Sequence, residues 1–313
     1  MDGIILVNKP RNCTSHDIVL KIRTMIQMSK VGHFGTLDPM ATGLLIISVG
    51  KATRLFPFYS KTDKVYTGVI KLGFSTNTYD AEGEKTSKET HAFPGEKNVL
   101  KAIKSFEGEI LQTPPSYSAK KYHGKPFYAL ARAQKEFPLK PIKKNIYHFR
   151  LTRFSLPDIH FDVKCSSGTY IRSLAHDLGQ MLGCGAHLSE LSRTASGAFT
   201  IADSTSLESI NIFVENKDFK AFLLPLEILL PEFPKIILNE TGSALARNGN
   251  VFSPDNIINI IHNKMSEINK QNIDIFRIFS IQDRIIALAK KLHTNNGYHP
   301  FLVLNTQDQT KKS

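Results

Sequence analysis

The chain has 313 residues, of which 41% are hydrophobic and 22% are charged. This composition excludes a wholly disordered, collagen-like or coiled-coil protein, and the length allows one large domain or two unequal ones. Lysine and arginine number 40 against 28 acidic residues, and the resulting net charge of +12 is typical of a protein that binds a polyanion.

Nucleic acid is a better expected partner than a membrane. The sequence holds no run of about 18 apolar residues, and its N-terminal residues carry neither a basic leader nor a lipidation signal. Its three cysteines, Cys13, Cys165 and Cys184, are widely spaced, which favours a reducing compartment over a disulfide framework or a structural zinc site. We therefore expect a soluble, cytoplasmic and monomeric protein without a bound metal.

The elements of the first half begin with a short apolar strand at residues 4–7. Ser15 is expected to cap a helix, because Ile18, Ile22 and Ile26 recur at helical spacing behind it. Strands are predicted at residues 44–49 and 64–72. A polar segment at 73–96 predicts a loop, and a helix is expected to follow it through residues 99–106.

The second half predicts strands near residues 146–154 and 160–165, then a helix over 171–182 that Gly183 ends. The proline-rich apolar segment at 223–234 indicates a boundary that packs across the first domain. Short strands beyond it predict a small β-rich unit. We expect domains at residues 1–230 and 231–306 with a frayed tail at 307–313, and an α+β fold, because helices and strands do not alternate regularly.

The basic surplus is concentrated between residues 114 and 153, where ten lysines and arginines face one acid, Glu136. Tyrosines and phenylalanines are interleaved with these charges, and looped or single-stranded RNA is bound by this combination of cations and flat rings. A solvated basic face whose aromatic rings belong to the core is the equally weighted alternative. Prolines and Gly124 indicate an excursion from the core over about 114–145.

The most distinctive segment is Gly32-His33-Phe34-Gly35-Thr36-Leu37-Asp38-Pro39-Met40-Ala41-Thr42-Gly43, which leads directly into the predicted strand at 44–49. Its glycines and proline predict a tightly turning backbone around one carboxylate, which a ligand can approach closely. Local physics alone favours a plainer interpretation, in which Asp38 is a helix N-cap followed by proline.

This segment resembles the catalytic motif of the TruB family of pseudouridine synthases, whose pattern is close to GHxGTLDPxATGxL. Further family motifs follow in the same order along most of the chain: Val7-Asn8-Lys9-Pro10, Lys64-Val65-Tyr66, Thr78-Tyr79-Asp80-Ala81-Glu82-Gly83, the segment 112–121, Cys165-Ser166-Ser167-Gly168-Thr169-Tyr170-Ile171-Arg172 and Gly185-Ala186-His187-Leu188. Arg247-Asn248-Gly249-Asn250 is similar to the small RNA-binding PUA-like domain of bacterial members. The sequence departs from the family at Phe34 and Ser167, two positions that we expect to influence RNA contacts.

The resemblance implies a pseudouridine-synthase fold, with a mixed, largely antiparallel sheet flanked by helices and a PUA-like C-terminal domain. It also implies isomerisation of uridine at position 55 in the T-loop of tRNA, after the nucleotide is flipped out of its stack. The reaction breaks the bond between N1 and C1′, turns the base and rejoins it through C5. Because no electrons are gained or lost, the resemblance implies no cofactor.

The family pattern assigns the nucleophile to Asp38, which has three possible routes: attack at C1′, attack at C6, or elimination. Arg172 is expected to keep this carboxylate charged inside a dry pocket through a two-pronged contact. Tyr66 is expected to lie against the uracil and to take the C5 proton. The other substrate-binding residues that the resemblance implies are His33, Tyr170, Leu191 and Lys9, the last as a brace for the active-site loop, and the RNA-binding residues are Lys120, Lys121, Lys125 and Arg132.

Two other functions are compatible with parts of this sequence. A non-catalytic tRNA-binding protein that assists tRNA folding shares the basic segment and differs only in whether Asp38 matters. A metal-dependent nuclease or hydrolase would use His33, Asp38 and Asp80, but these residues do not form a compact set of ligands in the sequence.

Overall fold

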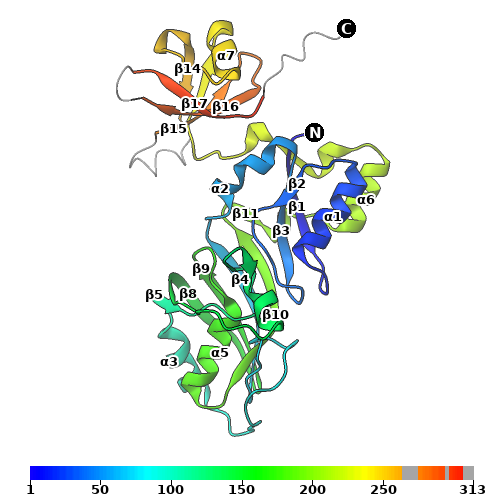
Figure 1. Cartoon of the computed structure of the whole chain (residues 1–313), viewed down its shortest axis with the longest axis vertical. Coiled ribbons are helices and arrows are strands. Elements are labelled where there is room, and N and C mark those ends of the chain that lie inside the picture. The colour runs from blue at the N-terminus through cyan, green and yellow to red at the C-terminus, as the bar shows by residue number, and fades with distance from the viewer. Residues whose placement is uncertain (263–273, 293–295, 306–313) are drawn as a thin grey trace.

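The computed structural model describes residues 1–262, 274–292 and 296–305 (Figure 1). Two β-sheets organise these residues, and the frayed tail predicted at 307–313 lies outside them. Ten strands form the larger sheet between Gly3 and Pro225, and five strands form the smaller sheet between Lys235 and Val303. Figure 1 shows the smaller sheet, in yellow to red, set apart at one end of the molecule.

The larger sheet runs in the order β12-β1-β3-β10-β4-β9-β8-β5, with β2 beside β3 and β11 beside β10. Its one parallel contact in the described residues joins β3 to β10, and the remaining pairs are antiparallel. The strands are β1 (Gly3–Lys9), β2 (Val31–His33), β3 (Thr42–Val49), β4 (Lys64–Leu72), β5 (Gly108–Gln112), β8 (Ile142–Ser155), β9 (Asp158–Cys165), β10 (Ala186–Ser196), β11 (Phe199–Thr200) and β12 (Leu223–Pro225).

The helices bury apolar faces against this sheet. Buried side chains of α3 (Glu96–Lys104) and α5 (Ile171–Leu182) share one core with β4, β8, β9 and β10, and α1 (Ser15–Ile26) and α6 (Leu207–Glu215) pack beside β1. Gly183 ends α5 in the left-handed conformation at φ +73°, as expected. The expectation that Ser15 caps α1 is wrong: the N-cap is Thr14, which forms a reciprocal capping box with Asp17. The Ser15 side chain is therefore free for another contact.

The segment between β5 and β8 leaves the sheet, as its prolines predict. It contains a short hairpin of β6 (Lys121–Tyr122) and β7 (Lys125–Pro126) and a single helix of six residues, α4 (Phe127–Arg132). Residues 73–95 form no helix or strand apart from single bridges, so the predicted loop is confirmed.

The smaller sheet has the order β14 (Ile257–Ile261), β13 (Lys235–Leu238), β15 (Ile275–Phe279), β16 (Ile285–Lys291) and β17 (Tyr298–Val303), with α7 (Glu240–Arg247) packed against it. An apolar cluster shared by both sheets includes Leu6 and Phe34 on one side and Phe279 and Leu288 on the other. The segment after β12 contributes Leu226, Leu229 and Leu230 to this cluster, which confirms that the predicted boundary packs across the first sheet.

Phe34 is a core residue of this shared cluster. It stacks on Tyr59 of α2 (Phe56–Tyr59), with ring centroids 5.1 Å apart, and is 2% exposed. The expectation that this residue influences RNA contacts is wrong for direct contact, because its ring is sealed between the two sheets. No helix among the described residues has the length and apolar character needed to span a lipid bilayer.

We predict that Gly43→Ser destabilises the protein. Gly43 has φ +99°, and a Cβ atom there would lie 2.4 Å from the carbonyl oxygen of Arg193, at the parallel contact of β3 with β10. Strain and overpacking at this position should cost about 2–4 kcal/mol, measured as a lower midpoint of urea unfolding.

The matched control is Gly95→Ser. Gly95 is the N-cap of α3, has φ −67°, and has no neighbouring atom within 4 Å of the added Cβ. Serine is preferred at such a cap, so this variant should unfold at or above the wild-type midpoint. Equal losses in the two variants would contradict the assigned role of the β3–β10 contact.

Candidate active site

The loop that carries Asp38 connects β2 to β3, and buried side chains hold it in place through hydrogen bonds. Lys9, whose side chain is fully buried, donates hydrogen bonds to the carbonyl oxygens of Cys13 at 2.7 Å and Pro39 at 3.3 Å. Ser15 accepts a hydrogen bond from the Leu37 amide at 2.8 Å and donates one to the Leu37 carbonyl. The loop is therefore held on both sides of Asp38 before any ligand is present.

Arg172 binds the Asp38 carboxylate through two parallel hydrogen bonds. Its Nε donates to Oδ2 at 2.9 Å and its Nη2 donates to Oδ1 at 3.1 Å. The side chain of Arg172 is 6% exposed, whereas that of Asp38 is 34% exposed and remains open to a ligand. This is the fork-to-carboxylate geometry that the sequence predicts for these two residues.

Asp80 is the second carboxylate at Arg172. Its Oδ2 lies 3.4 Å from Nη1 of Arg172, and its side chain is also 6% exposed. Asp80 in turn accepts hydrogen bonds from the Thr78 hydroxyl and the Glu82 amide, while the Thr78 carbonyl accepts from Arg172 at 3.1 Å. From the sequence alone Asp80 is a candidate only as a metal ligand, although its segment 78–83 is one of the motifs shared with the family.

Asp38 and Arg172 line a cavity of about 340 Å³. Within the range of small-ligand sites, this is a compact one. The cavity brings together most of the residues predicted for the site, including Tyr66, Lys120, Tyr170 and Leu191, and adds Lys64 and Arg193, which sequence reasoning missed. Lys9 does not line it, so its contacts support the predicted bracing of the loop and not a direct contact with substrate.

The two tyrosines of the cavity come from different elements. Tyr66 lies on β4 and Tyr170 is the N-cap residue of α5. Burial raises the pKa of both phenols. Burial by itself thus favours the neutral hydroxyl in both residues.

His33 lies at the end of β2, outside the lining of the cavity. Its Nδ1 accepts a hydrogen bond from the Gly35 amide at 3.4 Å, which fixes the start of the glycine-rich turn. Burial lowers its pKa, and the nearby positive charge of Arg193 lowers it further. A neutral imidazole is the form that this hydrogen bond requires.

The basic segment divides into two parts. Lys120 reaches the cavity wall, whereas Lys121, Lys125 and Arg132 are exposed around the β6–β7 hairpin and α4. Its rings divide as well: Phe127 and Phe149 are buried, but Tyr122 and Tyr128 are exposed, and the Arg132 guanidinium lies over the Tyr128 ring at 5.7 Å. The buried rings thus belong to the core, and the exposed rings leave RNA binding by this segment a prediction.

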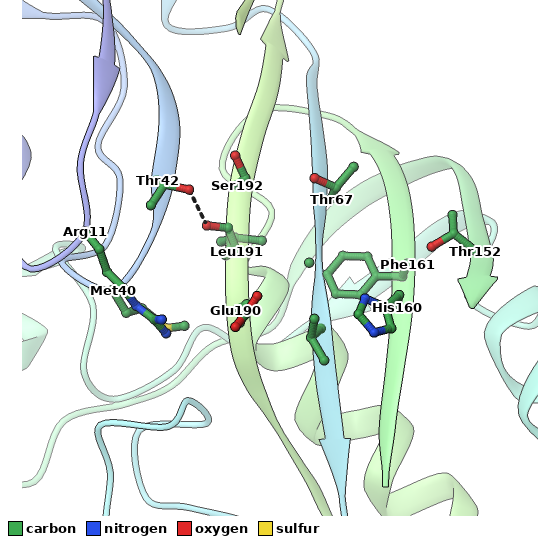
Figure 2. A pocket seen from close by; sticks show the side chains of 12 residues that line it. Arg11, Met40, Thr42, Thr67, Thr152, His160, Phe161, Glu190, Leu191 and Ser192 are labelled. Atoms are coloured by element: carbon green, nitrogen blue, oxygen red, sulfur yellow. Dashed lines mark hydrogen bonds between the residues drawn. The ribbon is translucent and has the colours of Figure 1, made fainter. Parts of the chain in front are cut away.

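A second cavity, of about 300 Å³, adjoins the first at Leu191 (Figure 2). Figure 2 shows the Thr42 hydroxyl donating a hydrogen bond to the Leu191 carbonyl, with Thr67 and Ser192 on neighbouring strands. Thr67 directly follows Tyr66 in β4, so its side chain points to the other face of the sheet. Its lining includes Arg11 and Glu190 but neither Asp38 nor Arg172, whose two-pronged contact belongs to the first cavity alone.

A metal-dependent hydrolase is not supported by the geometry. The Arg172 guanidinium lies between Asp38 and Asp80 and contacts both carboxylates, so it occupies the position that a cation would take. Among residues 1–262, 274–292 and 296–305, no group of three or more histidine, cysteine or acidic side chains is arranged to hold a metal ion.

Comparisons with known proteins agree with this geometry. The family model for the N-terminal domain of TruB family pseudouridylate synthases matches residues 23–171, and the model for the C-terminal domain of tRNA pseudouridylate synthase B matches residues 172–231. The tRNA pseudouridine synthase B of Solibacter usitatus is 43% identical over 252 residues, which cover 80% of this chain and 86% of that protein. Its counterpart from Clostridium tetani is 40% identical and covers 95% of this chain and 98% of its own.

Two solved structures share the fold. A chain of an H/ACA RNP bound to a substrate RNA containing 2'-deoxyuridine has a TM-score of 0.72 and 25% identity, and covers 98% of this chain and 86% of its own. A chain of a Cbf5-Nop10-Gar1 complex has a TM-score of 0.71 and 26% identity, and the match covers 97% of this chain and 85% of that one. The predicted pseudouridine-synthase fold, with its mixed sheet and β-rich C-terminal part, is thereby confirmed.

We predict that Arg172→Lys slows single-turnover conversion of uridine in a tRNA transcript by about 10²-fold, because one ammonium cannot reproduce the two-pronged contact with Asp38. The control is Arg284→Lys, which alters a surface arginine 3.7 Å from Glu227. A single-turnover rate of Arg172→Lys that matches the wild type would contradict this role.

Proposed function

This chain belongs to the TruB family of pseudouridylate synthases, and we propose that it isomerises uridine at position 55 in the T-loop of tRNA. The observation that carries the proposal is the accessible Asp38 carboxylate, held by Arg172 at the mouth of a compact cavity. The curated relatives are tRNA pseudouridine synthases, and one structural neighbour binds a substrate RNA. The choice of the T-loop rests on the family resemblance.

In the proposed reaction Asp38 supplies the nucleophile. A carboxylate can attach to a carbon atom and leave again, which suits a reaction that returns every atom to the product. Arg172 contributes in two ways: it keeps both carboxylate oxygens oriented, and its positive charge stabilises the anionic form in a partly dry cavity. Asp80 limits the movement of Arg172 from the opposite side.

The remaining residues of the cavity are proposed to hold the base while it is detached. Tyr66 lies against the uracil and takes the C5 proton, Tyr170 covers the other side, and Leu191 forms an apolar floor. A detached uracil must turn without escaping, so flat rings and an apolar surface suit it better than fixed polar partners. The enzyme is proposed to act as a monomer.

The base must leave its stack to reach this cavity, at a cost of a few kcal/mol. We propose that the basic segment offsets this cost, with Lys120 at the cavity wall and Lys121, Lys125 and Arg132 on phosphates of the T-arm. The smaller sheet is proposed as a PUA-like second contact with tRNA, and the catalytic domain as residues 1–230. The described cysteines are free thiols, which suits the cytoplasm.

The proposed chemistry predicts that Asp38→Asn abolishes pseudouridine formation and leaves tRNA affinity within about twofold of the wild type, because the amide keeps the shape but not the nucleophile. Conversion is measured by chemical mapping of pseudouridine in an unmodified transcript. The control is Asp158→Asn, at the start of β9 and outside the cavity.

A tRNA-folding protein without activity would give a different result. Wild-type protein would then leave the uridine unconverted, and Asp38→Asn would behave as the wild type in refolding a misfolded transcript. Retained turnover in Asp38→Asn would instead contradict the nucleophile assignment alone.

A triple alanine variant of the exposed cations is predicted to reduce the salt dependence of binding. The slope of log affinity against log salt should become shallower by roughly 2–3 if each side chain neutralises one phosphate. The variant replaces Lys121, Lys125 and Arg132, and the control replaces three exposed lysines elsewhere: Lys88, Lys97 and Lys101. Equal changes in the two variants would show that net charge, and not this segment, governs binding.

A further inference from the structure

A second buried arginine, Arg193, ties the catalytic loop to β10. It is 2% exposed, and its Nε donates to the Leu44 carbonyl at 2.8 Å. Its Nη2 and Nη1 donate to the carbonyl oxygens of Gly35 at 3.2 Å and Thr36 at 3.4 Å. These carbonyl groups precede and follow Asp38, so one guanidinium holds both ends of the loop.

Arg193 is also the cross-strand neighbour of Tyr66. The two residues are register partners in the antiparallel pair of β10 with β4, next to a bulge between Arg193 and Ala195. Both line the cavity, and facing residues of an antiparallel pair project from the same side of the sheet, so the two side chains are neighbours. Tyr66 therefore lies beside the side chain that holds the Asp38 loop.

The positive charge of Arg193 is not neutralised by an acidic neighbour. Across the part of the chain that the structure describes, Arg193 forms no ion pair with a carboxylate, and its recorded acceptors are backbone carbonyls. Burial lowers the pKa of Lys9, His33 and Lys64, and the nearby charge of Arg193 lowers each of them further. An uncompensated buried cation of this kind favours an anion beside it.

Burial and the neighbouring groups shift the pKa of the Tyr66 phenol in opposite directions. Burial raises its pKa most strongly, and the nearby Cys165 and Asp38 raise it further. The positive charge of Arg193, the neighbour of Tyr66 across the strand pair, lowers the pKa of this phenol. A phenolate at this position would thus depend on Arg193, because burial, Cys165 and Asp38 all favour the neutral phenol.

We propose that Arg193 is a positioning residue for proton removal, which aligns Tyr66 with the Asp38 loop and stabilises the Tyr66 phenolate. The inference rests on the proposed function. Once C5 is bonded to C1′ and C6 is double-bonded to N1, the C5–H bond breaks and the proton passes to the Tyr66 oxygen. The electron pair of that bond forms the C5–C6 double bond, and the π pair of C6–N1 moves to N1, which takes a proton from solvent. The phenol has lost its own proton to solvent beforehand, and Arg193 keeps its charge throughout.

A kinetic isotope effect tests this assignment. Transcripts carrying uridine or [5-²H]uridine at the target position are converted under single-turnover conditions by wild-type protein, Arg193→Lys and Arg193→Gln. We expect about tenfold slower turnover for Arg193→Lys and a larger loss for Arg193→Gln, with an isotope effect that exceeds the wild-type value in both. The rising limb of the pH–rate profile should move to higher pH, because removal of the guanidinium raises the pKa of Tyr66.

The matched control is Arg277→Lys, because Arg277 is similarly buried in the smaller sheet and also donates to backbone carbonyls, those of Glu227, Leu229 and Phe233. It should leave the isotope effect and the pH profile unchanged. Since an isotope effect is a ratio of rates, partial unfolding of a variant does not alter it. Slower turnover of the Arg193 variants with the wild-type isotope effect and pH profile would overturn the proposal.

A direct titration keeps the test independent of turnover. The ring-carbon signal of Tyr66 in ¹³C-tyrosine-labelled protein, assigned with Tyr66→Phe, should titrate at higher pH in Arg193→Gln than in wild type. An unshifted titration would overturn the proposal even if both variants are inactive. Wild-type protein that forms no pseudouridine but shows this shift would refute the proposed function and leave the coupling of Arg193 with Tyr66 intact.

Discussion

The site depends on the Arg172 guanidinium, which lies between two carboxylates and leaves one of them accessible. Asp80 is buried with Arg172, whereas Asp38 has about a third of its side chain exposed. Because Arg172 is fixed by Asp80 and by carbonyl groups of two loops, it holds Asp38 without having to reorganise. The cost of burying this arginine is offset by the number of its acceptors, as buried charges require.

The fold supplies this arrangement by closing a short loop between two strands. Lys9 and Ser15 hold the loop from one side, and Arg193 ties its ends to β10. Gly43 permits the close parallel contact of β3 with β10, which a side chain would block. The shape of the cavity thus depends on Lys9, Ser15 and Gly43, which do not line it, as well as on Arg193, which does.

The two buried arginines of the cavity have different partners. Arg172 has carboxylate partners and orients Asp38, while Arg193 has carbonyl partners and keeps its charge available to Tyr66. The acidic and phenolic groups of the proposed reaction are therefore each controlled by a different guanidinium. Outside the cavity, we propose that the exposed cations of the segment between β5 and β8 provide a sequence-independent attraction to RNA.

Local patterns in the sequence determined most of the elements and the list of candidate residues. Hydrophobic periodicity located α5, β3 and β4, and the ordered motifs indicated Asp38, Arg172, Tyr66 and Tyr170, because spacing and residue type are properties of the chain itself. Tertiary structure decided the pairings. Phe34 is buried in a cluster shared with the smaller sheet, Asp80 lies beside Arg172, and Arg193 is the cross-strand neighbour of Tyr66. These residues are distant in the sequence, and strand register and packing that no local pattern encodes bring them together.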